Sequence, residues 1–122
     1  MSESITITLS LPSRVLSPNG RHHWRAKAKA VKAYRSLAWL TTQQSIKGAP
    51  LWKSATVVCH FYFAQRRGRD GDNLLASMKS AFDGIRDAGL IKNDVGLTHL
   101  PVVIDYDKAR PRVEVTLTRV QE

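Results

Sequence analysis

Two long segments with helical periodicity alternate with shorter segments of strand type along the chain. Residues 24–45 contain no Gly or Pro and are rich in Ala and Lys, which favours a long helix. Apolar residues at helical spacing indicate a second, amphipathic helix over residues 73–88, with Gly89 as its C-terminal cap. Alternating or β-branched and aromatic residues predict strands at residues 4–11, 54–63, 99–106 and 112–119.

This order, β-α-β-α-β-β, predicts an α+β (mixed α/β) fold with two main helices and a mixed sheet. The length suits one small domain over residues 1–122. Cys59 lies in an apolar run and is expected to be buried. The core is also expected to hold Trp24, Trp39 and Trp52, and the alternative is that these indoles serve as base-stacking platforms. The chain shows neither a signal-peptide pattern nor an apolar run long enough to span a bilayer, so we expect a cytoplasmic protein with no membrane partner.

The positive charge of the chain is concentrated before residue 70. Residues 4–69 contain 12 Lys or Arg and no Asp or Glu, and the formal net charge is +9. Such a balance favours a polyanionic partner, either nucleic acid or an acidic membrane surface. We expect two groups to contact DNA phosphates: Arg25, Lys29 and Lys32 on one face of the first helix, and the cluster Arg66, Arg67 and Arg69. A solvated charged face is the usual alternative for the helix.

Two carboxylates follow the arginine cluster at once. Asp70 and Asp72 lie between a predicted strand and a predicted helix, where both can face one point. Carboxylate oxygens are the ligands that Mg²⁺ prefers. Asp94 lies past the other end of that helix and approaches the pair only if the loop after Gly89 folds back. The alternative is that Asp70, Asp72 or Asn73 merely caps the helix.

Lys79 follows Asp72 by seven residues, about two helical turns, and is expected on nearly the same helix face. It either stabilises charge at a phosphoryl centre or forms an ion pair with Asp83 four residues later. The spacing by itself favours the ion pair.

One run of residues resembles a known family. Arg69-Asp70-Gly71-Asp72-Asn73-Leu74, followed by Lys79, Phe82-Asp83-Gly84, Gly89 and Asn93-Asp94, is similar to RusA-type Holliday-junction resolvases, many of them encoded by phages and prophages. Weaker matches are Leu11-Pro12, Pro18-Asn19, Ala33-Tyr34-Arg35 and residues 111–115. The family lysine often sits one turn after the second Asp, where this chain has Ala76.

The resemblance implies a homodimeric crossover junction endodeoxyribonuclease that cuts four-way DNA junctions by paired symmetric nicks, in DNA recombination and repair. It implies Asp70, Asp72 and Asp94 as ligands of Mg²⁺, with Mn²⁺ as a substitute, and Lys79 as the catalytic cation. Two other hypotheses remain. One is a non-catalytic basic nucleic-acid-binding module, and the other is a metal nuclease acting on flaps, forks, other branched DNA or RNA.

Overall fold

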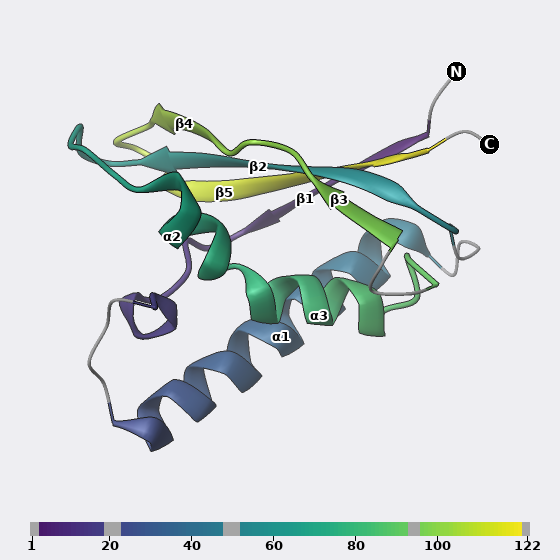
Figure 1. Ribbon diagram of the computed structural model, residues 1–122, viewed down its shortest axis with the longest axis horizontal. Coiled ribbons are helices and arrows are strands. Elements are labelled where there is room, and N and C mark those ends of the chain that lie inside the picture. Colours follow the sequence, from purple (N-terminus) through teal and green to yellow (C-terminus); the bar gives the residue numbers. More distant parts are fainter. Residues whose placement is uncertain (1–2, 19–22, 48–51, 93–95, 121–122) are drawn as a thin grey trace.

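The computed structural model describes residues 3–18, 23–47, 52–92 and 96–120. In chain order these residues form β1 (Ser4–Leu9), the short 3-10 helix η1 (Arg14–Leu16), α1 (Trp24–Ile46), β2 (Ala55–Phe63), α2 (Gly71–Ala76), α3 (Lys79–Asp87), β3 (Leu97–His99), β4 (Val103–Tyr106) and β5 (Arg112–Arg119). A mixed five-stranded sheet carries the helices on one face (Figure 1). The predicted α+β class with a mixed sheet is confirmed.

The sheet has β5 at its centre, antiparallel to both of its neighbours. β5 pairs with β1 on one side and with β2 on the other. The free edge of β2 pairs in parallel with β3 along its first residues and with β4 along its last. The single strand predicted at residues 99–106 is therefore wrong. Pro101, which has no backbone N–H to donate, lies in the break between the two strands.

Alternate residues of the strands point toward the helices and form the core. Every second residue of β2 from Ala55 to Phe63 is buried, together with Val113, Val115 and Leu117 of β5. Cys59 is buried as predicted, and desolvation raises the pKa of its thiol to about 12. Because inward and outward residues alternate so regularly, the other sheet face remains polar.

The helix predicted over residues 73–88 is in fact two helices. Met78 N donates to Leu75 O, three residues back, and the hydroxyl of Ser77 donates to Asn73 O. This tighter turn separates α2 from α3. α3 then packs against α1, and the break lets its axis follow α1 while α2 stays at the end of β2 (Figure 1).

The tryptophans do not all join the core as predicted. Trp52 is 3% exposed, but Trp24 is 68% exposed and Trp39 is 43% exposed. Trp24 opens α1 before the helix reaches the sheet, and Trp39 lies beside the face of α1 that carries buried Tyr34 and Ala38. Within the described residues, no helix combines the length and the apolar character needed to cross a membrane.

Candidate functional site

An open groove of about 560 Å³ lies at the end of β2, between the connection to α2 and the segment around η1. Its charged lining consists of Arg14, Arg67, Arg69 and Asp70. Three guanidinium groups thus share the groove with one carboxylate, which gives it a positive charge. Such a groove suits an anionic ligand.

Arg69 packs on an aromatic ring within this groove. Its guanidinium carbon lies 3.6 Å from the centroid of the Phe63 ring, and its Nη2 donates to Gln65 O at 3.3 Å. Its Nε is buried and has no hydrogen-bond partner among the described residues. Desolvation, followed by repulsion from Arg67, lowers the pKa of Arg69. An anion at this position would relieve both effects.

The predicted arginine cluster separates in the structure. Arg67 and Arg69 line the groove, whereas the guanidinium of Arg66 lies 4.5 Å from the centroid of the Tyr106 ring on β4. Arg14 joins the groove from η1, although it is far from the cluster in sequence. Sequence reasoning missed Arg14 because a single arginine in a loop carries no local signal.

Asp70 is the N-cap of α2. Its Oδ1 accepts from the backbone N–H groups of Asp72 at 2.9 Å and Asn73 at 3.4 Å, and its Oδ2 accepts from Asn73 Nδ2 at 3.3 Å. The capping interpretation is therefore confirmed for Asp70. A carboxylate offers about four lone pairs, so these three bonds leave acceptor capacity for a cation.

Asp72 lies in the first turn of α2 and lines a second hollow, next to Lys79 and His99. The hollow brings Asp72 and Lys79 together across the break between α2 and α3. The ion pair between Lys79 Nζ and Asp83 Oδ2 is present at 3.7 Å, and the Lys79 side chain is 83% exposed. The two aspartates therefore line different hollows, although they flank the same helix start.

His99 is a neighbour of Asp72 that sequence reasoning missed. Its ring packs against Phe82 with centroids 4.6 Å apart. Desolvation lowers the pKa of His99, which favours the neutral imidazole near neutral pH. A neutral imidazole beside Asp72 and Lys79 is able to accept or donate a proton.

Asn93 and Asp94 lie outside the described residues. Within the parts of the chain that the structure describes, no group of three or more His, Cys, Asp and Glu side chains is arranged to hold a metal ion. Asp70 and Asp72 nevertheless supply the donors that Mg²⁺ takes in proteins, where one or two carboxylates are completed by water and phosphate. The donor type suits Mg²⁺, and joint ligation by the three carboxylates stays a prediction.

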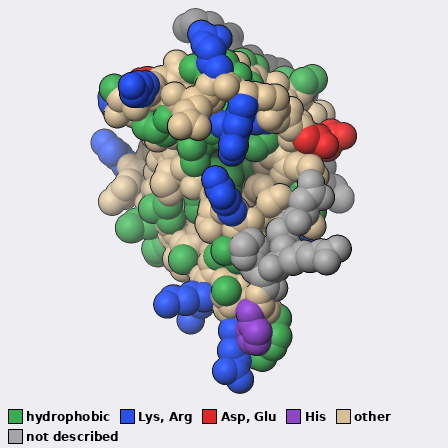
Figure 2. Space-filling view, turned by 90° about the vertical axis from the view of Figure 1, so that its left-hand side faces the viewer, with side chains coloured by type: hydrophobic (Ala, Val, Ile, Leu, Met, Phe, Trp, Pro, Cys, Tyr) green, Lys and Arg blue, Asp and Glu red, His purple; other side chains and the backbone are tan. Residues whose placement is uncertain are grey.

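The three cations predicted on α1 are all exposed. Arg25, Lys29 and Lys32 lie on the solvent side of the helix, and the Arg25 guanidinium lies 5.2 Å from the centroid of the Trp24 ring. Figure 2 shows Lys and Arg side chains from one end of the viewed face to the other, with acidic side chains confined to its upper part. The contact of these cations with DNA stays a prediction.

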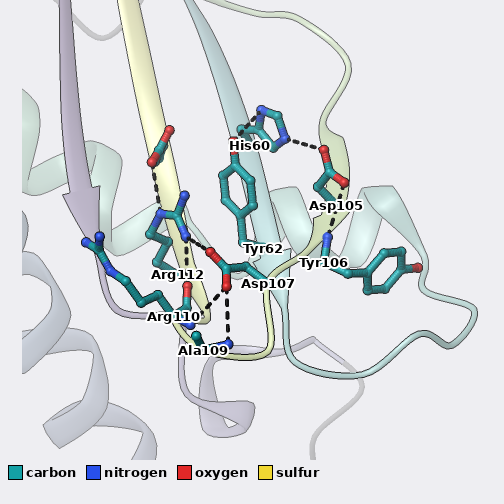
Figure 3. A network of polar contacts seen from close by, with 9 residues as sticks. His60, Tyr62, Asp105, Tyr106, Asp107, Ala109, Arg110 and Arg112 are labelled. Carbon is teal, nitrogen blue, oxygen red and sulfur yellow. Dashed lines mark hydrogen bonds and ion pairs between the residues drawn. The ribbon is translucent and has the colours of Figure 1, made fainter.

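A second polar cluster lies on the sheet face opposite the helices (Figure 3). Arg112 donates to Glu114 and to Asp107, each at 2.9 Å, and its guanidinium carbon lies 3.9 Å from the Tyr62 ring centroid. The hydrogen bond from Arg112 lowers the pKa of Asp107, which also accepts from two backbone N–H groups of the β4–β5 turn. Both carboxylates are already paired with Arg112, so the cluster is better suited to holding the turn than to binding a metal.

Next to this cluster, His60 bridges two neighbours. Its Nε2 lies 3.3 Å from Asp105 Oδ2, and its Nδ1 lies 3.4 Å from the Tyr62 hydroxyl. The His60 and Tyr62 rings stack with centroids 4.3 Å apart. This arrangement links β2 to β4 on the open face and lies apart from the groove that holds Asp70.

Comparison with known proteins defines a family for the chain. No protein-family model matches it. The chain is 34% identical over 126 aligned residues to a protein of Xylella fastidiosa (strain Temecula1 / ATCC 700964) that carries the name "Uncharacterized protein". The match covers 96% of this chain and 78% of the relative. The chain therefore belongs to the same family as this Xylella protein, whose name specifies no activity.

Proposed function

We propose that the protein is a Mg²⁺-dependent, structure-selective endodeoxyribonuclease of the RusA type, which resolves four-way DNA junctions by paired symmetric nicks in recombination and repair. The observation that carries this proposal is the groove in which Asp70 lies beside Arg14, Arg67 and Arg69. A carboxylate among arginines allows a phosphodiester and a metal to be held side by side. Arginines without the carboxylate would bind only the phosphodiester, and the carboxylate without the arginines would bind only the metal.

The arginines have a direct role in this proposal. Arg14, Arg67 and Arg69 bind phosphates of one strand, and the packing of Arg69 on Phe63 holds its guanidinium in place before DNA arrives. Fixed positive charge in a partly desolvated groove stabilises negative charge that grows on the phosphate during the reaction.

Asp70 and Asp72 would hold the metal, with Asp94 as the third predicted ligand. When bound, Mg²⁺ supplies a water of lowered pKa and a counter-charge for the phosphate. The cap bonds from Asp72 N and Asn73 N fix the Asp70 carboxylate at the start of α2. Lys79 offsets charge in the hollow that it shares with Asp72.

A twofold homodimer belongs to the same proposal. A four-way junction presents two related scissile sites, and two copies of one groove related by a twofold axis would match them. The number of nicks per binding event tests this arrangement. A homodimer is expected to make two symmetric nicks, whereas a single subunit would cut one strand at a time.

The second candidate function is a non-catalytic basic nucleic-acid-binding module. The specific observation in its favour is the cap, because Asp70 already makes three hydrogen bonds to the first turn of α2. This candidate keeps the arginine groove as a DNA-binding surface and gives Asp70 a purely structural role. It predicts binding without strand scission.

A cleavage assay separates the two candidates. The protein is incubated with a mobile four-way junction, a fork and a linear duplex of the same strands, in Mg²⁺, Mn²⁺ or EDTA. Paired symmetric nicks in Mg²⁺, chiefly on the junction, are the expected result. Tight binding with no nicks in either metal would favour the binding module. Nicks mainly on the fork would indicate a nuclease for other branched DNA.

A further inference from the structure

The first turns of α1 extend beyond the body of the protein. Every side chain from His23 to Lys29 is exposed, and in Figure 1 this end of the helix lies well away from the sheet. The first buried side chain of α1 is Tyr34. About two turns of helix thus precede the first residues that pack on the core, Ala30 and Val31, and packing against the sheet does not explain the residues of these turns.

Trp24 stands at the tip of this extension. At 68% exposure it is the most exposed large apolar side chain among the described residues. This exposure leaves most of the indole available for contact with a ligand. The ring is flanked by His23, whose ring centroid lies 5.7 Å away at an interplanar angle of 28°, and by the Arg25 guanidinium.

The surroundings of Trp24 are basic and sterically open. Arg25, Lys27, Lys29 and Lys32 follow it within little more than two turns, and α1 contains no acidic residue. Between these cations lie alanines, whose small side chains let a ligand approach the helix closely. Cations lie on both sides of Trp24 around the helix, which leaves no broad apolar face of the kind that inserts into a membrane surface.

From these observations we propose that Trp24 is a stacking platform for an unpaired DNA base, with Arg25 and Lys29 on the neighbouring phosphates. Exposed aromatic rings beside basic side chains bind unpaired nucleotides by stacking, whatever the base. In duplex DNA both faces of each base are covered by its stacked neighbours, whereas an opened branch point leaves its innermost bases unstacked and able to unpair. The inference rests on the proposed function for its DNA ligand, and it explains how branched DNA is preferred over duplex.

The test compares two DNAs in EDTA, so that no cleavage occurs. One is a fully paired duplex, and the other is the same duplex with a central bulge of unpaired thymines. Trp24→Ala is expected to weaken binding to the bulged DNA by about tenfold or more, with little change on the duplex. Trp24→Phe should retain most of the affinity. Trp39→Ala, which removes another exposed indole of α1, is the matched control and should bind like the wild type.

Two further readouts distinguish stacking from lost charge. The slope of log affinity against log salt should be the same for Trp24→Ala and wild type, because no cation is removed. A 2-aminopurine placed in the bulge should be quenched by the wild type and much less by Trp24→Ala.

The proposal would be overturned by equal losses on the two DNAs, by no loss on either, or by a Trp24 effect confined to anionic lipid vesicles. A Trp24-dependent preference for the bulge in a protein that never cuts junctions would uphold this inference and refute the nuclease.

Discussion

Arg35 of α1 and Asp87 of α3 form a two-point ion pair that joins the two helices. Arg35 Nε lies 2.6 Å from Asp87 Oδ2, and Arg35 Nη2 lies 3.0 Å from Asp87 Oδ1. This fork geometry fixes both the separation and the orientation of the partners. The hydrogen bond to Arg35 lowers the pKa of Asp87, and the same bond raises the pKa of Arg35.

The pair makes stability depend on pH in a defined direction. The folded-state pKa of Asp87 lies below its ordinary value of 3.8, so the folded state binds a proton less readily than the unfolded state. The stabilisation is complete above 3.8 and is lost as the pH falls through the folded-state pKa. We therefore expect Asp87→Asn to lower Tm modestly at pH 7 and to have almost no effect in strong acid.

Thermal unfolding of both proteins from pH 7 down to strong acid checks this expectation. Arg35→Lys keeps the charge but removes the fork, and it should lose part of the stabilisation. A Tm difference for Asp87→Asn that is constant over the whole pH range would show that the ion pair is not its source.

The approach of α3 to α1 also depends on Gly84. A Cβ at this position would overlap the Arg35 carbonyl oxygen and lie 3.0 Å from both Ala38 Cβ and Trp39 N. Backbone atoms of a packed helix cannot move aside cheaply, so Gly84→Ala should destabilise the fold by about 1–3 kcal/mol or more. Gly68→Ala is the control, because nothing lies within 4 Å of its Cβ position. Urea unfolding measures the free energy of unfolding of both variants, and the comparison is valid if the m-values are unchanged. Equal losses of stability in Gly84→Ala and Gly68→Ala would contradict this packing.

The regular helices and strands could be predicted from the sequence because one face of each element is buried. The alternation in β1, β2 and β5 and the composition of α1 follow directly from that burial. The break at Ser77 and Met78 could not be predicted from the sequence, because neither residue strongly disfavours a helix. The exposure of Trp24 was missed for a related reason, since composition does not tell how far a helix extends beyond the sheet.

The candidate site was predictable only where its residues are close in sequence. Arg67, Arg69 and Asp70 share a groove because they lie on one short connection. Arg14 and His99 reach the two hollows through the fold, and no local pattern marks them. The separation of Asp70 from Asp72 follows from the cap, which turns the Asp70 carboxylate back toward the amides of α2.

Lys79 offers a test that separates activity from stability. Its ion pair with Asp83 is long and exposed, so Lys79→Ala should change the free energy of unfolding by only about 0.2–0.5 kcal/mol. If Lys79 offsets charge beside Asp72, the same variant should lose most of its junction cleavage. Lys79→Arg keeps the charge and should retain part of the rate. If Lys79→Ala cleaves junctions at the normal rate, Lys79 has no role in cleavage and only forms the ion pair with Asp83.

Arg14 tests the groove itself. Replacing it by Ala should weaken binding to all DNA sequences and reduce the magnitude of the salt slope by about 1, because one phosphate contact is lost. Arg110→Ala removes a charge from the exposed β4–β5 turn and is the matched control. Binding titrations over a range of salt concentrations measure both slopes. If the salt slope of Arg14→Ala equals that of the wild type, the phosphates of the bound DNA do not contact Arg14 in this groove.

Asp72 carries the sharpest prediction about chemistry. It is exposed in the first turn of α2, where a carboxylate adds only about 0.3–1 kcal/mol through the helix dipole, so Asp72→Asn should fold normally. As a metal ligand, its loss should reduce junction cleavage in Mg²⁺ by about a thousandfold or more. Junction binding should stay equal or become tighter, because one negative charge near the phosphates is gone.

The matched control is Asp105→Asn, which neutralises an exposed carboxylate on the open sheet face, beside His60. This variant should cleave at the wild-type rate, since its carboxylate lies apart from the groove. Single-turnover cleavage and EDTA binding titrations of both variants supply the two readouts. Cleavage at normal rate by Asp72→Asn would remove Asp72 from the metal site and leave Asp70 as a helix cap. Equal losses in the two variants would point to a general charge effect instead of a ligand.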